Sequence, residues 1–136
     1  MPFVTKESGS TLQKEREGVW VAYEEGELKI ARLGNPHNRQ VFQRIRAPFK
    51  RQIQRGTLTD TQQARIIAET YAESLLLDWK GMTDEEGNEF PYNRDNAIAV
   101  LMNDMDLRDF VEQTAQEAAL FRVEEVESRG KGSRRK

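Results

Sequence analysis

The chain has 136 residues, 37% of them hydrophobic and 32% charged, which is enough for one domain with a modest core and a heavily solvated surface. It contains no cysteine and one histidine, His37, so disulfides, thiolate nucleophiles and sulfur-ligated metal centres are excluded. No apolar run approaches the length of about 18 residues that spans a bilayer, and the first ten residues lack the apolar core of a signal peptide. We therefore expect a cytoplasmic protein that does not enter a membrane.

The net charge of −2 conceals a strong asymmetry along the chain. The stretch 35–59 contains no acidic residue, and its basic residues are Arg39, Arg44, Arg46, Lys50, Arg51 and Arg55. Residues 69–127 are dominated by Asp and Glu, whereas residues 128–136 are basic again. This separation predicts pairing of the basic stretch with an acidic surface, on the same chain or on a partner.

The N-terminal part of the chain predicts a flexible segment followed by a β-hairpin. Residues 1–16 are polar and lack a period. In 19–33, β-forming residues stand on both sides of a glycine turn, "EEGE". A two-stranded hairpin is marginal alone, so we expect it to pack on helices.

A basic amphipathic helix follows, with Asn35 as N-cap and Pro36 at its first position. Its apolar stripe runs through Val41, Phe42, Ile45, Phe49 and Ile53. Pro48 lacks an N–H and predicts a break near Arg46 and Ala47. The candidate surface for a client or for self-association is Arg39, Phe42, Arg44, Ile45, Phe49 and Ile53; the alternative is that the apolar members are core residues.

Three further helices are expected. The first is a central core helix from about Thr61 to Trp79, capped by Thr59 or Asp60 and ended by Gly81. The second is a short helix capped by Asn93. The last is capped by Asp106, and its stripe comprises Leu107, Phe110, Val111, Thr114, Ala118, Phe121 and Val126.

The loop "TDEEGNE" resembles a calcium loop only superficially. An EF-hand beginning at Asp84 requires glycine at position 6 and glutamate at position 12, but Gly87 falls at position 4 and Asp95 at position 12. A solvated turn in which Gly87 has a positive φ is the simpler interpretation. The residues expected to anchor this loop are Trp79, Gly87, Phe90, Pro91 and Tyr92, although the aromatic rings also suit a ligand cage.

The remaining residues give little sign of catalysis. No nucleophile elbow, phosphate loop or HExxH motif occurs, and an enzyme would have to use lysines, hydroxyls or carboxylates such as Asp78 and Glu89. His37 is read as an ordinary surface residue. We expect no enzymatic activity, no cofactor and no metal. The basic stretch could also neutralise phosphates, but nucleic acid is the less favoured partner because most of the chain is acidic.

In order, the segments "ARLGNPHN", "RAPF" and "LLLDWKGMTDEEGNEFPYNRDNAIAVL" precede an acid-capped final helix. Over roughly residues 17–127 this arrangement resembles the small tail assembly chaperones of long-tailed, siphophage-type bacteriophages. The resemblance implies a non-enzymatic protein that binds the tape measure protein, keeps it soluble and helps recruit tail tube protein. It also implies action in the host cell cytoplasm and departure before the virion is finished.

The sequence thus predicts a mainly α fold of about four helices with a small N-terminal β-hairpin (α+β), in one domain over 17–127 with a basic flexible tail at 128–136. Two other function classes stay open. One is a structural minor tail or head–tail joining protein of the virion. The other is a nucleic-acid-binding accessory protein that uses the basic stretch and the tail.

Overall fold

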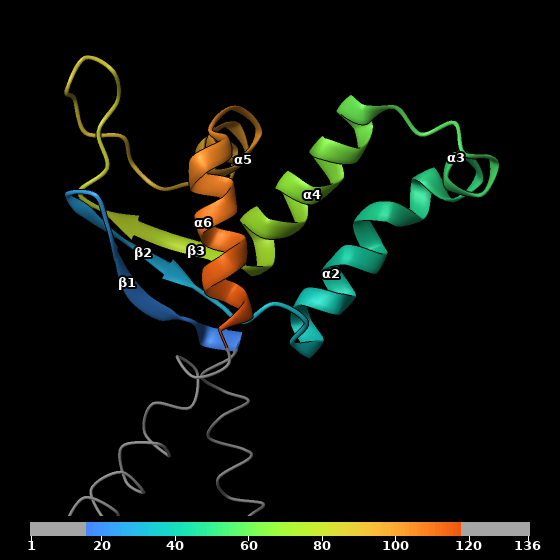
Figure 1. The fold of residues 1–136 in the computed structure, drawn as a ribbon, viewed down its shortest axis with the longest axis horizontal. Coiled ribbons are helices and arrows are strands. Elements are labelled where there is room, and N and C mark those ends of the chain that lie inside the picture. Colours follow the sequence, from blue (N-terminus) through green and yellow to red (C-terminus); the bar gives the residue numbers. More distant parts are fainter. Residues whose placement is uncertain (1–15, 118–136) are drawn as a thin grey trace, which may run out of the picture.

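The computed structural model describes residues 16–117 and shows the predicted mainly α fold with a small antiparallel sheet (Figure 1). Its strands are β1 (Val19–Tyr23), β2 (Gly26–Ile30) and β3 (Leu76–Lys80). Its helices are α2 (Pro36–Arg46), the 3-10 turn η1 (Ala47–Phe49), α3 (Lys50–Arg55), α4 (Asp60–Ser74), α5 (Arg94–Asn103) and α6 (Met105–Gln116). The predictions for residues 1–15 and 118–136 lie outside the described residues, including Ala118, Phe121 and Val126 of the last helix.

The sheet has the order β1-β2-β3, with the predicted hairpin at one edge. Val19 pairs with Ile30 and Tyr23 with Gly26. A Cβ at Gly26 would lie 2.3 Å from the carbonyl oxygen of Lys80, so only glycine allows β3 to approach this closely. The hairpin is therefore shaped to receive a third strand.

That third strand corrects the sequence prediction, which extended the central helix to Trp79. Helix α4 ends at Ser74, and β3 pairs with β2, Leu28 lying opposite Trp79. The run "LLLDW" is apolar at both the helical and the strand period, so periodicity could not decide between them. Pairing with β2 satisfies the backbone and buries Leu76 and Trp79, and Gly81, with φ 72°, follows a strand rather than a helix.

The helix boundaries depend on side-chain caps. Asn35 accepts a hydrogen bond from the Asn38 backbone N–H at 3.0 Å, Thr59 forms a capping box with Gln62, and Asn93 caps α5, as predicted. The cap of α6 is Asp104, which accepts from the Leu107 N–H at 3.0 Å, and the prediction of Asp106 was wrong. Asp104 has the extended backbone that a cap requires, whereas Asp106 lies in the first turn.

The core lies between the sheet and helices α4, α5 and α6. Its fully buried large residues include Leu28 and Ile30 of β2, Leu75 and Leu76 where α4 meets β3, and Leu101 and Leu107 of α5 and α6. No helix in the described part of the chain combines the length and apolarity needed to cross a bilayer. The sheet and these three helices form what we call the body of the protein.

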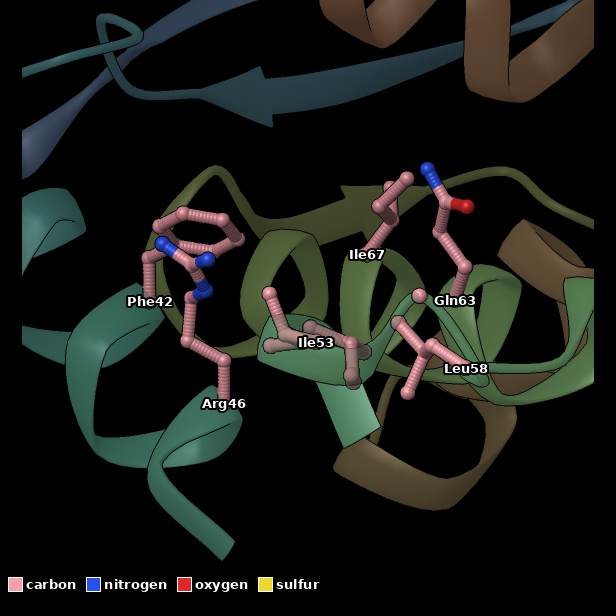
Figure 2. Close-up of a pocket in the computed structure, with 8 residues that line it drawn as sticks. Phe42, Arg46, Ile53, Leu58, Gln63 and Ile67 are labelled. Carbon is pink, nitrogen blue, oxygen red and sulfur yellow. The ribbon is translucent and has the colours of Figure 1, made fainter. Parts of the chain in front are cut away.

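Helices α2 and α3 with η1 form an arm (residues 36–55) that leaves this body. Helix α2 packs beside α4, and α3 lies at the end farthest from the sheet (Figure 1). The break at Pro48 occurs as predicted, and η1 and α3 contain no buried residue. Phe42 and Ile53 of the arm and Ile67 of α4 line an open space between the two (Figure 2).

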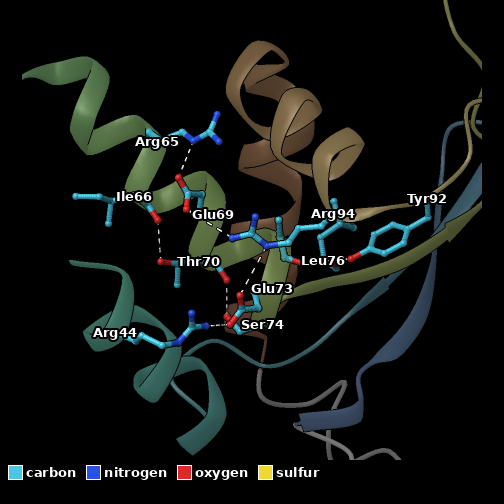
Figure 3. Close-up of polar contacts among 11 residues, drawn as sticks. Arg44, Arg65, Ile66, Glu69, Thr70, Glu73, Ser74, Leu76, Tyr92 and Arg94 are labelled. Carbon is cyan, nitrogen blue, oxygen red and sulfur yellow. Dashed lines mark hydrogen bonds and ion pairs between the residues drawn. The ribbon is translucent and has the colours of Figure 1, made fainter. Parts of the chain in front are cut away.

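A chain of buried hydrogen bonds attaches the base of the arm to the end of α4. The Asn38 side chain accepts from the Gly34 N–H at 2.9 Å and donates to the Ser74 hydroxyl at 2.8 Å. Ser74 and Thr70 donate in turn to backbone carbonyls one turn earlier in α4, at 2.6 and 2.7 Å (Figure 3). Every buried side-chain N or O atom of the described residues has a partner.

Half-exposed ion pairs surround this network (Figure 3). Glu73 of α4 pairs with Arg44 of α2 and, at 3.7 Å, with Arg94 of α5. Glu69 pairs with Arg94 at 3.6 Å and with Arg65 at 2.6 Å. Because these groups face water, the pairs orient the three helices more than they stabilise the fold.

We expect Asn38→Ala to lower the free energy of unfolding by roughly 1–3 kcal/mol, because it leaves buried hydrogen-bonding groups without partners. Urea unfolding followed by circular dichroism measures this difference. The neighbouring change Arg39→Ala is the control, since Arg39 is exposed and its loss should alter stability by only about 0.5 kcal/mol. Equal stabilities of the two variants would show that the network does not hold the arm.

The raised pKa values of the three tyrosines predict that the folded protein loses stability at high pH. Burial, and then the hydrogen bond that its hydroxyl donates to Glu112 at 2.5 Å, raise the pKa of Tyr71 far above its usual value. Burial also raises the pKa of Tyr23 and of Tyr92.

Above about pH 10 the tyrosines of the unfolded chain lose protons that the folded protein keeps, so the free energy of unfolding should be constant below this pH and fall above it. Urea unfolding between about pH 8 and 11.5, the range in which tyrosines titrate, measures this decline in the free energy of unfolding. The variant Tyr71→Phe should show a shallower decline. Tyrosinate absorbance of the folded protein with its midpoint at the ordinary pKa would contradict this.

Candidate functional site

An open apolar groove of about 440 Å³ lies between the arm and α4, and we call it the arm groove (Figure 2). Its lining combines apolar side chains with two long polar ones. The residues are Phe42, Arg46, Ile53, Gly56, Leu58, Gln63, Ile66 and Ile67.

The groove follows from the way the chain turns at the end of the arm. The break at Pro48 separates α3 from α2, and α3 ends at Arg55, followed by the capping residue Gly56 with φ 68°. The N–H groups of Gly56 and Thr57 bond back to the last turn of α3, and the Gln52 side chain donates to that of Gln62 at 3.0 Å. The far end of the groove is thereby attached to the start of α4.

The groove combines an apolar floor with a cation at its edge. Phe42 is 38% exposed, and the guanidinium carbon of Arg46 lies 4.9 Å from the centroid of its ring. No carboxylate lines the groove, and Arg46 forms no ion pair with any described residue. An apolar segment carrying an acidic residue fits this chemistry.

The structure places only some of the predicted surface residues in the groove. Phe42 and Ile53 lie in the groove, whereas Arg44 is paired with Glu73 on α4. Arg39 is exposed, and Ile45 and Phe49 are half-buried without lining the groove. The candidate surface is thus only partly brought together.

Sequence reasoning missed Arg46, Leu58, Gln63 and the isoleucine pair of α4 as groove residues. The adjacent pair Ile66-Ile67 carried a signal, because neighbours on a helix point in different directions. Both line the groove, Ile66 as a buried residue and Ile67 as a half-buried one. The sequence predicts the helix that carries them only as a core helix.

The aromatic residues of the 82–92 loop surround Trp79. Its indole N–H donates to the Phe90 carbonyl at 2.7 Å, its ring stacks on Phe90 with centroids 5.7 Å apart, and Tyr92 meets it edge-on at 5.1 Å. The exposed Pro91 lies between these two rings in the chain, and its carbonyl accepts from the Asn96 side chain at 2.8 Å.

The acidic turn of this loop is closed by hydrogen bonds between its own residues. The Asp84 carboxylate accepts from the N–H groups of Glu86 and Asn88, both at 2.9 Å, and Gly87 has φ 84°. Across residues 16–117, no three His, Asp or Glu side chains are gathered as a metal-ligand set. Of the two carboxylates weighed for acid–base work, Asp78 accepts from the adjacent Trp79 N–H at 2.8 Å, and Glu89 is exposed.

Comparison with known protein families shows where the chain comes from. The family model of the YdaY prophage protein matches residues 33–131, which include the whole arm, α4, the 82–92 loop and the last two helices. No curated protein and no solved structure matches the chain. Since the match covers most of the 136 residues, the protein is of phage origin and belongs to the YdaY prophage protein family.

Proposed function

We propose that this phage protein is a tail assembly chaperone. In this proposal it binds an apolar helical segment of the tape measure protein in the arm groove and helps to recruit tail tube protein. It acts in the host cell cytoplasm, without catalysis, and leaves before the virion is complete. The phage origin and the resemblance of residues 17–127 to such chaperones support the proposal.

The observation that carries the proposal is the open groove itself. Phe42 is 38% exposed and Ile53 is half-buried, so a helix laid between the arm and α4 would remove apolar surface from water. Each Å² removed contributes about 25 cal/mol. A groove of about 440 Å³ suits the apolar face of an amphipathic helix, which is a common mode of peptide recognition.

The first test is a pull-down of tagged protein from lysate in which the phage genes are expressed, with mass spectrometry of the eluate and of purified virions. Recovery of tape measure and tail tube proteins, with this protein missing from virions, is the expected result. A stoichiometric amount in virions would indicate a structural minor tail or head–tail joining protein instead. Elution only with nucleic acid would favour the accessory protein.

Substitutions in the groove test where the client binds. We expect Phe42→Ser and Ile53→Ser each to reduce recovery of the tape measure protein about tenfold, because residues buried at the centre of an interface contribute most of the affinity.

The matched control is Trp20→Ser. Trp20 is 37% exposed, close to the 38% of Phe42, but lies on β1 against Lys80. Its loss should leave recovery unchanged. If all three variants kept the tape measure protein while melting at similar temperatures, the client would bind elsewhere, even with the chaperone function intact.

A further inference from the structure

A second cavity of about 700 Å³ lies where the hairpin turn, the 82–92 loop and the α5–α6 junction meet, and we call it the acidic cleft. Residues of the hairpin and loop that line it are Tyr23, Glu24, Met82, Thr83, Asp84, Glu85 and Phe90. From α5 and α6 come Ala99, Val100 and the run 103–107. In Figure 1 the hairpin turn and loop lie on the opposite side of the body from α3.

The charged residues that line the acidic cleft are all negative. Its carboxylates are Glu24, Asp84, Glu85, Asp104 and Asp106, and no Lys or Arg lines it. Within the described residues none of these five forms an ion pair, in contrast to Glu69 and Glu73, which three arginines neutralise. Uncompensated carboxylates at one cavity leave a negative potential that attracts a cationic partner.

The five carboxylates are not equivalent. Asp84 and Asp104 accept hydrogen bonds from backbone N–H groups of the turn and of α6. Glu24, Glu85 and Asp106 have no such bond and are exposed. Burial, and then the charges of Asp104, Glu24 and Asp106, raise the pKa of Tyr23. The negative charges of these three acids are therefore all felt at the Tyr23 hydroxyl, beside the cleft.

The floor of the cleft is apolar. Met105, at the start of α6, is 63% exposed, and Met82, Phe90 and Val100, which also line the cleft, are half-buried. A small cation would leave this surface in water, whereas a peptide with apolar and basic side chains would cover it. The acids around the cleft also do not form a metal-ligand set.

We propose that the acidic cleft is a docking site for a basic, amphipathic helical segment of a partner protein. Lysine or arginine side chains of that segment pair with Glu24, Glu85 and Asp106, and its apolar side chains contact Met105 and Phe90. The site is independent of the arm groove and of the function proposed for it. Because the two surfaces lie on opposite sides of the body, two partners can bind at once.

The test uses the full chain and a fluorescein-labelled helical peptide with one leucine face and one lysine face. Its twin carries glutamate in place of every lysine. Fluorescence anisotropy at about 0.1 M salt, where the Debye length is about 10 Å, measures both affinities. Binding of the lysine peptide and not of its twin is the expected result.

Two triple variants separate the cleft from overall charge. Glu24→Gln, Glu85→Gln and Asp106→Asn together should weaken the lysine peptide about tenfold, because each lost rim pair contributes a small and roughly equal part of the affinity. The matched control is Glu27→Gln, Glu86→Gln and Asp109→Asn, which changes the net charge equally at exposed residues outside the cleft. Met105→Ala should weaken binding about threefold through lost apolar contact.

Several outcomes would overturn the proposal. Equal weakening by both triple variants would show attraction to net charge alone, and full affinity of Met105→Ala would show that the floor is unused. Weak calcium sites in proteins bind the ion at roughly millimolar concentration. Displacement of the peptide by calcium at that concentration would indicate a cation site. Self-association of the chain that the cleft triple variant abolishes would assign the cleft to a second copy.

Discussion

The hydrogen bond between the side chains of Asn38 and Ser74 fixes the direction in which the arm leaves the body. Ser74 is the last residue of α4, so the bond connects the start of the arm to the point where the chain turns into β3. Two polar groups buried together must satisfy each other, and this requirement permits few relative positions of α2 and α4. The groove and the position of the sheet therefore depend on the same contact.

The arm is attached to α4 at its base and again at its far end, and the groove lies between the two attachments. The arm continues through the break at Pro48 into α3, which has no buried residue and is joined to α4 through Gln52 and Gln62. A continuous straight helix would have carried Ile53 further along its own axis, about 1.5 Å per residue, instead of back toward α4. The exposed apolar groove is thus a consequence of the proline and of Gly56, not of a deficit of core residues.

Local signals in the sequence were sufficient for most of the fold, but not for the features that require distant residues. The caps Asn35, Thr59 and Asn93, the hairpin and the break at Pro48 could all be predicted from neighbouring residues. Strand β3 could not, because a longer helix would have used the same apolar residues, and only pairing with β2, about fifty residues earlier, decided between the two. The groove likewise needed Ile53 and Ile67 to meet across a turn whose angle no sequence pattern specifies.

The distribution of charge in the described residues supports the two proposed docking surfaces. In the centre of the molecule, acids and arginines neutralise each other along α4, while Lys50, Arg51 and Arg55 of the arm and the carboxylates of the cleft form no ion pairs among the described residues. Unpaired basic charge is thus present on the arm and unpaired acidic charge at the cleft, each near exposed apolar side chains. In the two proposals, these charges select and orient large partners before contact, and the apolar surface beside them then holds the partners.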